Sequence, residues 1–215
     1  MVAAKETLEK ILEHASSLTS LQGSLLSAAN GKGMRSLLVT SGRDQEGKST
    51  VAIGLAVALA RQANAKVLLV DGNFRRPALA NLFGLSVEPG LREFLTGSSG
   101  EQVIQKTDEP RLSLLTSGGS GSIAELLTKL PERLRALYDG FDYVIFDGDS
   151  TLTSSEAVLL ARHVDGVVLV AECEQTKWEI LALCKEKLVR LGGTVLGVVL
   201  NKRQFYIPGA LYGKV

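Results

Sequence analysis

Short, continuous runs of apolar residues recur along the chain, separated by segments whose apolar positions repeat with helical spacing. Continuous runs are typical of parallel strands buried on both faces, whereas the helical spacing indicates amphipathic helices. Strands that alternate with helices predict βαβ units, and therefore an α/β fold with a mostly parallel central sheet flanked by helices. The expected strands are 36–40, 66–71, 112–116, 141–147, 166–171 and 195–201, and the expected helices are 5–18, 49–64, 77–83, 123–138, 154–163 and 178–191.

We expect three parts along the chain. Residues 1–33 form a helical N-terminal segment, residues 34–201 the main domain and residues 202–215 a tail. In the first segment, apolar residues between Leu8 and Leu18 share one helical face. That face fits a helix packed on its own sheet, and it also fits a docking surface for a partner or another subunit.

Composition and charge exclude several classes of protein. The 215 residues are 45% apolar and 22% charged, with 24 Lys and Arg against 23 Asp and Glu. A net charge of +1 without a clustered basic helix argues against binding nucleic acid. Nowhere do about 18 apolar residues follow one another, and the charged N-terminus does not resemble a signal peptide. We therefore expect a cytoplasmic protein, whose association with a membrane would depend on a partner.

A phosphate-binding loop is predicted between the first expected strand of the sheet and the helix after it. Residues 42–49 fit the pattern G-x-x-x-x-G-K-[ST]. Its glycines allow backbone N–H groups to surround a phosphate at the positive end of the next helix. Lys48 is then expected to contact the β- and γ-phosphates of ATP, Ser49 to bind Mg²⁺ and Thr50 to hydrogen-bond the α-phosphate. The pattern predicts the three-layer P-loop NTPase fold.

Two acidic residues, Asp44 and Glu46, lie inside this loop, where an inward carboxylate would repel phosphate. Because the loop binds phosphate through its main chain, we expect both side chains to face solvent, where charges are screened. The predicted nucleotide-binding residues of the loop are Gly42, Arg43, Asp44, Gln45, Glu46, Gly47, Lys48, Ser49 and Thr50.

Two expected strands end in an aspartate, Asp71 after residues 67–70 and Asp147 after residues 143–146. Ligands of open α/β sheets collect at the carboxyl ends of strands, and Mg²⁺ takes oxygen ligands. We therefore predict metal-binding roles for both carboxylates. The alternative is that each caps a turn or a helix, as is common at strand ends.

Several further stretches, taken together with the loop, resemble one family. They are Asp71-Gly-Asn-Phe-Arg-Arg-Pro77, Leu82–Leu85, Gly90–Gly97, Ala124–Leu127, Asp165–Val170 and Leu196–Asn201. They resemble the bacterial tyrosine kinases, cytoplasmic P-loop kinases of capsule and exopolysaccharide systems that are related to ParA/MinD ATPases. The resemblance covers about Met34 to Asn201.

The resemblance implies an ATP-dependent protein-tyrosine autokinase that regulates the synthesis and export of a capsule or exopolysaccharide, with ATP and Mg²⁺ as cofactors. It implies catalytic roles for Lys48, Asp71 and Asp147: Asp71 assists Mg²⁺ and orients or deprotonates the tyrosine hydroxyl, and Asp147 holds the water shell of the metal. Together with Ser49, these two acids form the implied metal site. By the same analogy Asn201 contacts the adenine.

The resemblance also implies neighbours for the kinase. Arg75 and Arg76 are expected near the phosphates or a neighbouring subunit; the alternative is a solvated basic turn. A transmembrane chain-length regulator of polysaccharide synthesis is the expected partner. It would bring the protein to the inner face of the membrane.

Two departures from the family pattern concern the acids. The family has a second aspartate where this chain has Asn73, which carries no charge, so kinase activity is expected to be weakened. After Asp147 the family has Thr-Pro-Pro, whereas this chain has Gly-Asp-Ser. Our hypothesis is that Asp149 partly replaces the charge lost at Asn73.

The two ends of the chain also differ from the family pattern. Ring-forming members carry two arginines in the N-terminal helix, whereas the stretch with Glu6, Glu9 and Lys10 has none. A homo-oligomeric ring then needs a partner or does not form. In the tail, Tyr206 and Tyr212 are candidate phosphoacceptors, the alternative being an apolar tail packed on the body.

Two other functions stay open. A nucleotide-switched ATPase of the ParA/MinD kind is favoured by Asn73, but Arg43 stands where that group carries an additional lysine. A pseudokinase that binds nucleotide as a scaffold, without tyrosine transfer, is the other alternative.

Overall fold

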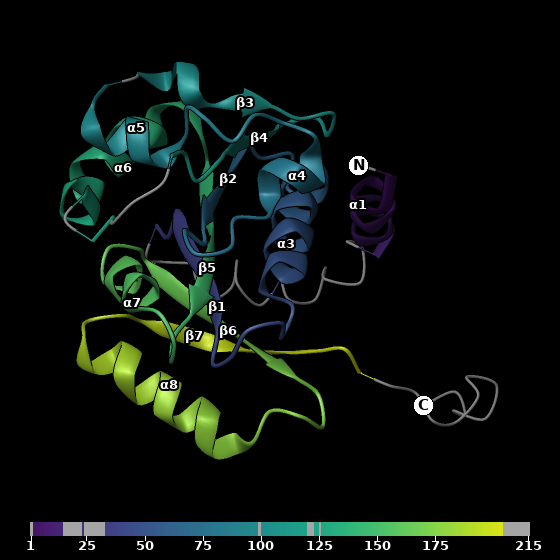
Figure 1. Ribbon diagram of the computed structural model, residues 1–215, viewed down its shortest axis with the longest axis vertical. Coiled ribbons are helices and arrows are strands. Elements are labelled where there is room, and N and C mark those ends of the chain that lie inside the picture. The colour runs from purple at the N-terminus through teal and green to yellow at the C-terminus, as the bar shows by residue number, and fades with distance from the viewer. Residues whose placement is uncertain are drawn as a thin grey trace.

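The computed structural model describes residues 2–14, 23, 33–98, 100–119, 123, 124 and 126–203. Within them a seven-stranded sheet has the order β3-β4-β2-β5-β1-β6-β7 (Figure 1). All pairs are parallel except β3 with β4, which is antiparallel. The strands are β1 (Ser36–Ser41), β2 (Val67–Gly72), β3 (Gln105–Lys106), β4 (Leu112–Leu115), β5 (Tyr143–Ser150), β6 (Gly166–Glu172) and β7 (Val195–Asn201).

Helices cover both faces of the sheet and make three layers (Figure 1). One face carries α1 (Val2–His14), α3 (Lys48–Gln62) and α4 (Leu79–Phe83). The other carries α5 (Leu91–Thr96), α6 (Leu130–Gly140), α7 (Ser155–Ala161) and α8 (Trp178–Arg190), together with the short 3₁₀ helices η2 (Glu101–Val103) and η3 (Leu126–Lys129). The expected α/β fold with a mostly parallel sheet is confirmed.

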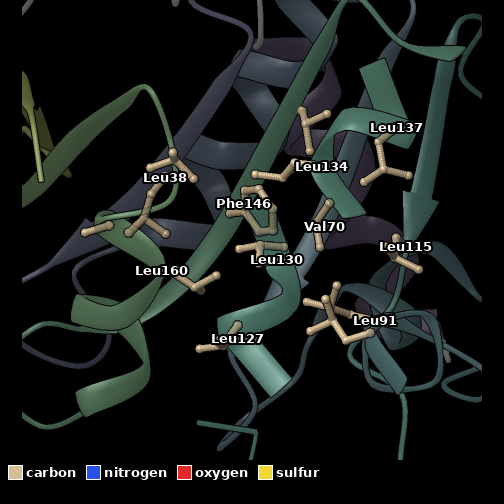
Figure 2. Packing of buried hydrophobic residues seen from close by; sticks show 14 of the residues in the cluster. Leu38, Val70, Leu91, Leu115, Leu127, Leu130, Leu134, Leu137, Phe146 and Leu160 are labelled. Atoms are coloured by element: carbon tan, nitrogen blue, oxygen red, sulfur yellow. The ribbon is translucent and has the colours of Figure 1, made fainter. Parts of the chain in front are cut away.

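Successive residues of each central strand enter opposite cores, because side chains alternate along a strand. In β2, Val67 and Leu69 pack under α3, whereas Leu68 and Val70 pack under the helices of the other face. Figure 2 shows that second core, where Phe146 of β5 lies among leucines of α6 and α7. By the same alternation, the aspartates at the ends of β2 and β5 lie on the α3 face.

Two expected elements differ clearly from those observed, and two observed elements were not expected. The strand expected to end at Asp147 continues to Ser150, because the residues after it pair with the end of β1 across a bulge. The helix expected over 123–138 is instead η3 followed by α6, which begins at Leu130 with Pro131 in its first turn. Helix α5 and strand β3 were not expected. The start of α5 carries the signal Gly-x-x-Glu, and the Glu93 side chain accepts a hydrogen bond from the N–H of Gly90.

Helix α1 packs within its own domain, against α3 and α4, whereas the first of the two interpretations of its apolar face expected it on the sheet. Ile11 is buried, and Leu8 and Leu12 pack against the core under α3. Arg61 of α3 donates a hydrogen bond of 3.3 Å to the carbonyl of Leu12 and pairs with Glu109. The boundaries at residues 33 and 201 stay predictions. No helix in the described part of the chain combines the length and the apolar character needed to cross a bilayer.

Replacing Gly90 by alanine tests the close packing at the start of α5. A Cβ there would lie 2.3 Å from the amide nitrogen of Gly118 and 2.5 Å from the carbonyl oxygen of Thr116. Both are backbone atoms, so we expect Gly90→Ala to lower the free energy of unfolding by about 1–3 kcal/mol, measured by urea denaturation. Gly140→Ala is the control, because a Cβ at Gly140 meets no atom within 4 Å. Equal stability of the two variants would contradict the prediction.

Candidate functional site

The phosphate loop joins the end of β1 to the first residue of α3, Lys48. Its backbone is left-handed at Gln45, where φ is 65°, and at Gly47, where φ is 94°. A Cβ on Gly47 would lie 1.9 Å from Nδ2 of Asn201, and that amide donates a hydrogen bond of 3.0 Å to the carbonyl of Glu46. Both the backbone conformation and the closeness of Asn201 require glycine at this position.

The side chain of Glu46 is buried behind the loop, with 4% of the residue exposed. One carboxylate oxygen accepts a hydrogen bond of 2.8 Å from the N–H of Arg43, and the other accepts one from the hydroxyl of Thr176, just before α8. The expectation that Glu46 faces solvent is therefore wrong. Its carboxylate satisfies polar groups inside the protein and braces the loop.

The carboxylate of Asp44 lines the cavity over the loop. It accepts a hydrogen bond from the hydroxyl of Ser150, and its other oxygen lies 3.4 Å from Nη1 of Arg76. The hydrogen bond from Ser150 and the positive charges of Lys48 and Arg76 hold the pKa of Asp44 below its ordinary value. The expectation that this charge points away into solvent is also wrong.

Lys48 is buried and points to the end of β5. Its Nζ donates a hydrogen bond of 3.2 Å to Oγ of Ser150, which in turn donates to Asp44. A hydrogen-bonded chain of ammonium, hydroxyl and carboxylate therefore lies across the loop. Nothing in the sequence singled out Ser150; the only available signal was its place three residues after Asp147.

Asp71 and Asp147 are strand partners, paired in register between β2 and β5 and fully buried. Oδ1 of Asp71 accepts a hydrogen bond from the N–H of Asn73, and Oδ2 accepts those of Ala78 and Leu79 at 3.0 Å. Asp71 therefore does cap a turn and the start of α4, as the alternative interpretation held. A carboxylate has about four acceptor positions, so one remains on Oδ1 for another donor.

Both oxygens of Asp147 lack a hydrogen-bond partner among the described residues. Burial and then the neighbouring Asp71 raise the pKa of Asp147, and the nearby Ser49 hydroxyl and Lys48 ammonium lower it. Burial also raises the pKa of Asp71, although its backbone hydrogen bonds oppose the shift. An unpaired buried carboxylate is costly, and a cation is the partner that removes this cost.

The oxygen atoms around Asp147 fit Mg²⁺ in its usual protein environment. Ser49 at the start of α3 supplies a hydroxyl, and Asp71 and Asp147 supply carboxylates. Among the described residues no three or more His, Cys, Asp or Glu side chains form a group that could hold a metal. Most ligands of a metal here would therefore come from phosphate and water, as is usual for Mg²⁺.

The basic turn after β2 is tied to the acids of the site. Nη1 of Arg75 lies 3.6 Å from Oδ2 of Asp149 and donates a hydrogen bond of 3.2 Å to the carbonyl of Thr153. The N–H of Arg76 donates a hydrogen bond of 3.1 Å to Oδ1 of Asn73. Both arginine side chains are exposed, by 43% and 66%, so contact with the phosphates and a solvated turn both stay predictions.

Two cavities meet at the loop. The smaller, about 320 Å³, lies over the phosphate loop and the ends of β2 and β5. The larger, about 620 Å³, lies between α1, α3 and β7. Thr50 and Lys202 line both. The smaller is lined by Asp44, Gln45, Gly47, Lys48, Ser49, Thr50, Asn73, Arg76, Asp149 and Lys202.

The lining of these cavities includes residues for which the sequence suggested no binding role. Lys202 donates a hydrogen bond of 2.7 Å to the carbonyl of Gln45 and pairs with Glu172, so it ties β7 to the loop. Thr7 and Lys10 of α1 line the larger cavity beside Asn201. The contact of Asn201 with adenine stays a prediction. Tyr206 and Tyr212 lie outside the described residues.

Comparisons with known proteins identify the family. Residues 37–204 match the model of the CobQ/CobB/MinD/ParA nucleotide binding domain. Tyrosine-protein kinase YwqD of Bacillus subtilis (strain 168) is 37% identical over 175 residues, which are 80% of this chain and 73% of that protein. The chain belongs to the bacterial tyrosine-protein kinase family.

Two solved structures agree with this membership. The kinase domain of Escherichia coli tyrosine kinase ETK is 28% identical with a TM-score of 0.81, and the match covers 90% of this chain and 79% of that one. The septum site-determining protein MinD of Pyrococcus horikoshii OT3, complexed with Mg-ADP, is 26% identical with a TM-score of 0.65, covering 82% and 74%. The resemblance to bacterial tyrosine kinases and their ParA/MinD relatives is confirmed.

Removing the charge of Asp44 is expected to strengthen nucleotide binding to this family member. Asp44 faces the same cavity as Lys48 and Arg76 and competes with phosphate for both cations. We expect Asp44→Asn to bind ADP about 3- to 10-fold more tightly, measured by fluorescence titration with a labelled nucleotide. Asp139→Asn, at an exposed position of α6, is the control. Weaker binding by Asp44→Asn would mean that this carboxylate serves the nucleotide.

The unpaired charge of Asp147 is expected to destabilise the protein when metal and nucleotide are removed. Because its pKa is raised in the folded state, the folded state holds a proton to higher pH than the unfolded chain, and stability falls as pH rises above about 4. Asp147→Asn should then raise the free energy of unfolding by about 1–3 kcal/mol near pH 8 and by less near pH 5. Chemical denaturation in EDTA measures the free energy of unfolding at both pH values. An equal effect of Asp147→Asn at pH 5 and pH 8 would contradict the raised pKa as its cause.

Proposed function

We propose that this protein is an ATP- and Mg²⁺-dependent protein-tyrosine kinase that phosphorylates tyrosines of its own chain. The observation that carries the proposal is a cavity over the phosphate loop that Lys48 and Ser49 line, with the buried, unpaired carboxylate of Asp147 near both side chains. The names of its relatives, which are tyrosine-protein kinases, support the same reaction.

In the proposed reaction the tyrosine oxygen forms a bond to the γ-phosphorus of ATP, and the bond from that phosphorus to the bridging oxygen breaks, releasing ADP. The backbone N–H groups of the loop and the ammonium of Lys48 stabilise negative charge on the phosphate oxygens. When bound, Mg²⁺ neutralises further phosphate charge. Ser49 and Asp147 are the residues that hold it.

Asp71 is the proposed acceptor of the tyrosine proton. Its three backbone hydrogen bonds fix the carboxylate, and Oδ1 keeps one free acceptor position. Burial raises its pKa toward neutral pH, which makes a carboxylate a better base than a solvated one. The side chain is therefore oriented and tuned for proton transfer.

Membership of the bacterial tyrosine-protein kinase family also supports a biological setting. We assign the protein to the control of capsule or exopolysaccharide synthesis and export, at the inner face of the membrane. A transmembrane chain-length regulator would be its partner, and Tyr206 and Tyr212 its phosphoacceptors. Arg75 and Arg76 would contact the phosphates or a neighbouring subunit.

A second candidate function is an ATPase switch of the ParA/MinD kind, or a scaffold that binds nucleotide without tyrosine transfer. Asn73 favours it, because the cavity then has an uncharged amide where a second acid would strengthen metal binding. The likeness to MinD, itself complexed with Mg-ADP, is compatible with this candidate.

Incubation of the purified protein with Mg²⁺ and labelled ATP distinguishes the candidates. A kinase yields phosphotyrosine, which mass spectrometry can assign to Tyr206 and Tyr212. We expect Lys48→Met and Asp71→Asn to lower the rate by about 10²- to 10³-fold. Lys185→Met, at an exposed position of α8, is the control and should retain the parent rate.

Other outcomes assign other functions. Phosphate release without labelled protein would contradict the kinase and support the switch. Tight nucleotide binding with neither product would support the scaffold. Label on Tyr138 or Tyr143 alone would contradict the proposed role of the tail.

A further inference from the structure

We infer that Asp149 supplies the second carboxylate that positions Mg²⁺ in the nucleotide site, a role that Asn73 cannot fill. The inference rests on the proposed Mg²⁺ and nucleotide site, and it adds a residue two positions beyond the end of the expected strand. It follows from the placement of one carboxylate oxygen.

The backbone of Asp149 is held in place by the extension of β5 along β1. Ser41 pairs with Ser150 after a register shift at which β5 has one residue more than β1, and the hydroxyl of Thr40 donates a hydrogen bond of 2.6 Å to the carbonyl of Asp149. That hydroxyl also lies 3.1 Å from the hydroxyl of Thr151. Asp149 is therefore part of the sheet and not of a loose loop.

The carboxylate of Asp149 is oriented as firmly as its backbone. Oδ1 accepts a hydrogen bond of 2.7 Å from the N–H of Ser150. Oδ2 is buried and has no hydrogen-bond partner among the described residues, although Asp149 lines the smaller cavity with Lys48 and Ser49. The side chain is 5% exposed, so solvent does not compensate for this oxygen. A cation, or a water molecule bound to a cation, would compensate for it.

Asn73 lies in the same cavity but carries no negative charge. Its side-chain oxygen already accepts the N–H of Arg76 in the turn after β2. That oxygen keeps one acceptor position but carries no charge, and the NH₂ group beside it donates hydrogen bonds and repels a cation. Of the two residues, only Asp149 carries a charge that attracts Mg²⁺ or orients its water.

Arg75 suggests a different role for Asp149, which the test must separate. Its Nη1 lies 3.6 Å from Oδ2, beyond hydrogen-bond distance, and Arg75 is 43% exposed on its side chain. If Asp149 served only to anchor Arg75, removing Arg75 would have the same effect as removing the carboxylate. If Asp149 acts on the metal, removing Arg75 takes away a competing positive charge and has the opposite effect.

The experiment measures how binding of labelled ADP depends on Mg²⁺ concentration, with the same titration in EDTA. The midpoint of this titration is the Mg²⁺ concentration at which the enhancement of ADP binding is half-maximal. We expect Asp149→Asn, which keeps the Oδ1 acceptor, to raise the midpoint by about 10- to 100-fold. Binding in EDTA should not weaken, because the variant removes a negative charge from the cavity over the phosphate loop. Asp139→Asn is the matched control on α6 and should change neither the midpoint nor ADP binding in EDTA.

Moving the charge provides the sharper test. The double variant Asn73→Asp with Asp149→Asn returns a carboxylate to the same cavity. We expect it to reverse at least about half of the change in the logarithm of the midpoint that Asp149→Asn causes. Asn73→Asp alone should lower the midpoint below the parent, and so should Arg75→Gln. These two single variants keep the inference testable if Asp149→Asn does not fold, which circular dichroism reports.

Three results would overturn the inference: an unchanged midpoint in Asp149→Asn, an equal loss of binding in EDTA, or a raised midpoint in Arg75→Gln. The binding measurement does not require kinase activity. If the parent forms no phosphotyrosine but the midpoints shift as expected, the proposed kinase reaction fails and the role of Asp149 stands. If the parent forms phosphotyrosine and the midpoints do not shift, the kinase stands and Asp149 has no metal role.

Discussion

Buried carboxylates at the carboxyl ends of β2 and β5 are the constraint on which this site depends. Two aspartates lie side by side on paired strands, a third follows two residues later, and all three are buried. The sheet could bury them cheaply only as neutral acids, or with a cation among them. Because the phosphate loop and the buried Lys48 lie opposite these strand ends, a metal ion held by a polyphosphate would be the cation that balances the charges.

Side chains of the protein itself already pair with some of the charges around the site. Lys48, Ser150 and Asp44 form one hydrogen-bonded chain across the loop, and the arginines after β2 pair with Asp44 and Asp149. These contacts neutralise cations that phosphate would otherwise hold. Nucleotide binding would therefore exchange internal partners for the ligand, and loop acids would influence affinity even where the loop binds phosphate through its main chain.

Sequence reasoning succeeded where the information is local. The periodicity of apolar residues predicted the parallel strands and the helices between them, and a spacing of glycines before Lys48 predicted the loop, because each depends on residues close in the chain. It failed for Glu46 and Asp44, both expected in solvent. Their partners, Thr176 and Ser150, lie more than a hundred residues away, so no local pattern could indicate that these carboxylates turn inward.

The chain alone therefore determined the fold class, the phosphate loop and the strand ends that carry Asp71 and Asp147, since hydrophobic periodicity and turn chemistry act over a few residues. Only the tertiary structure decided how those ends are used. It assigned Asp71 to cap α4, left Asp147 without a partner and continued β5 far enough to bury Asp149. Burial and hydrogen-bond satisfaction depend on which distant strands and helices meet, and no spacing within one segment contains that information.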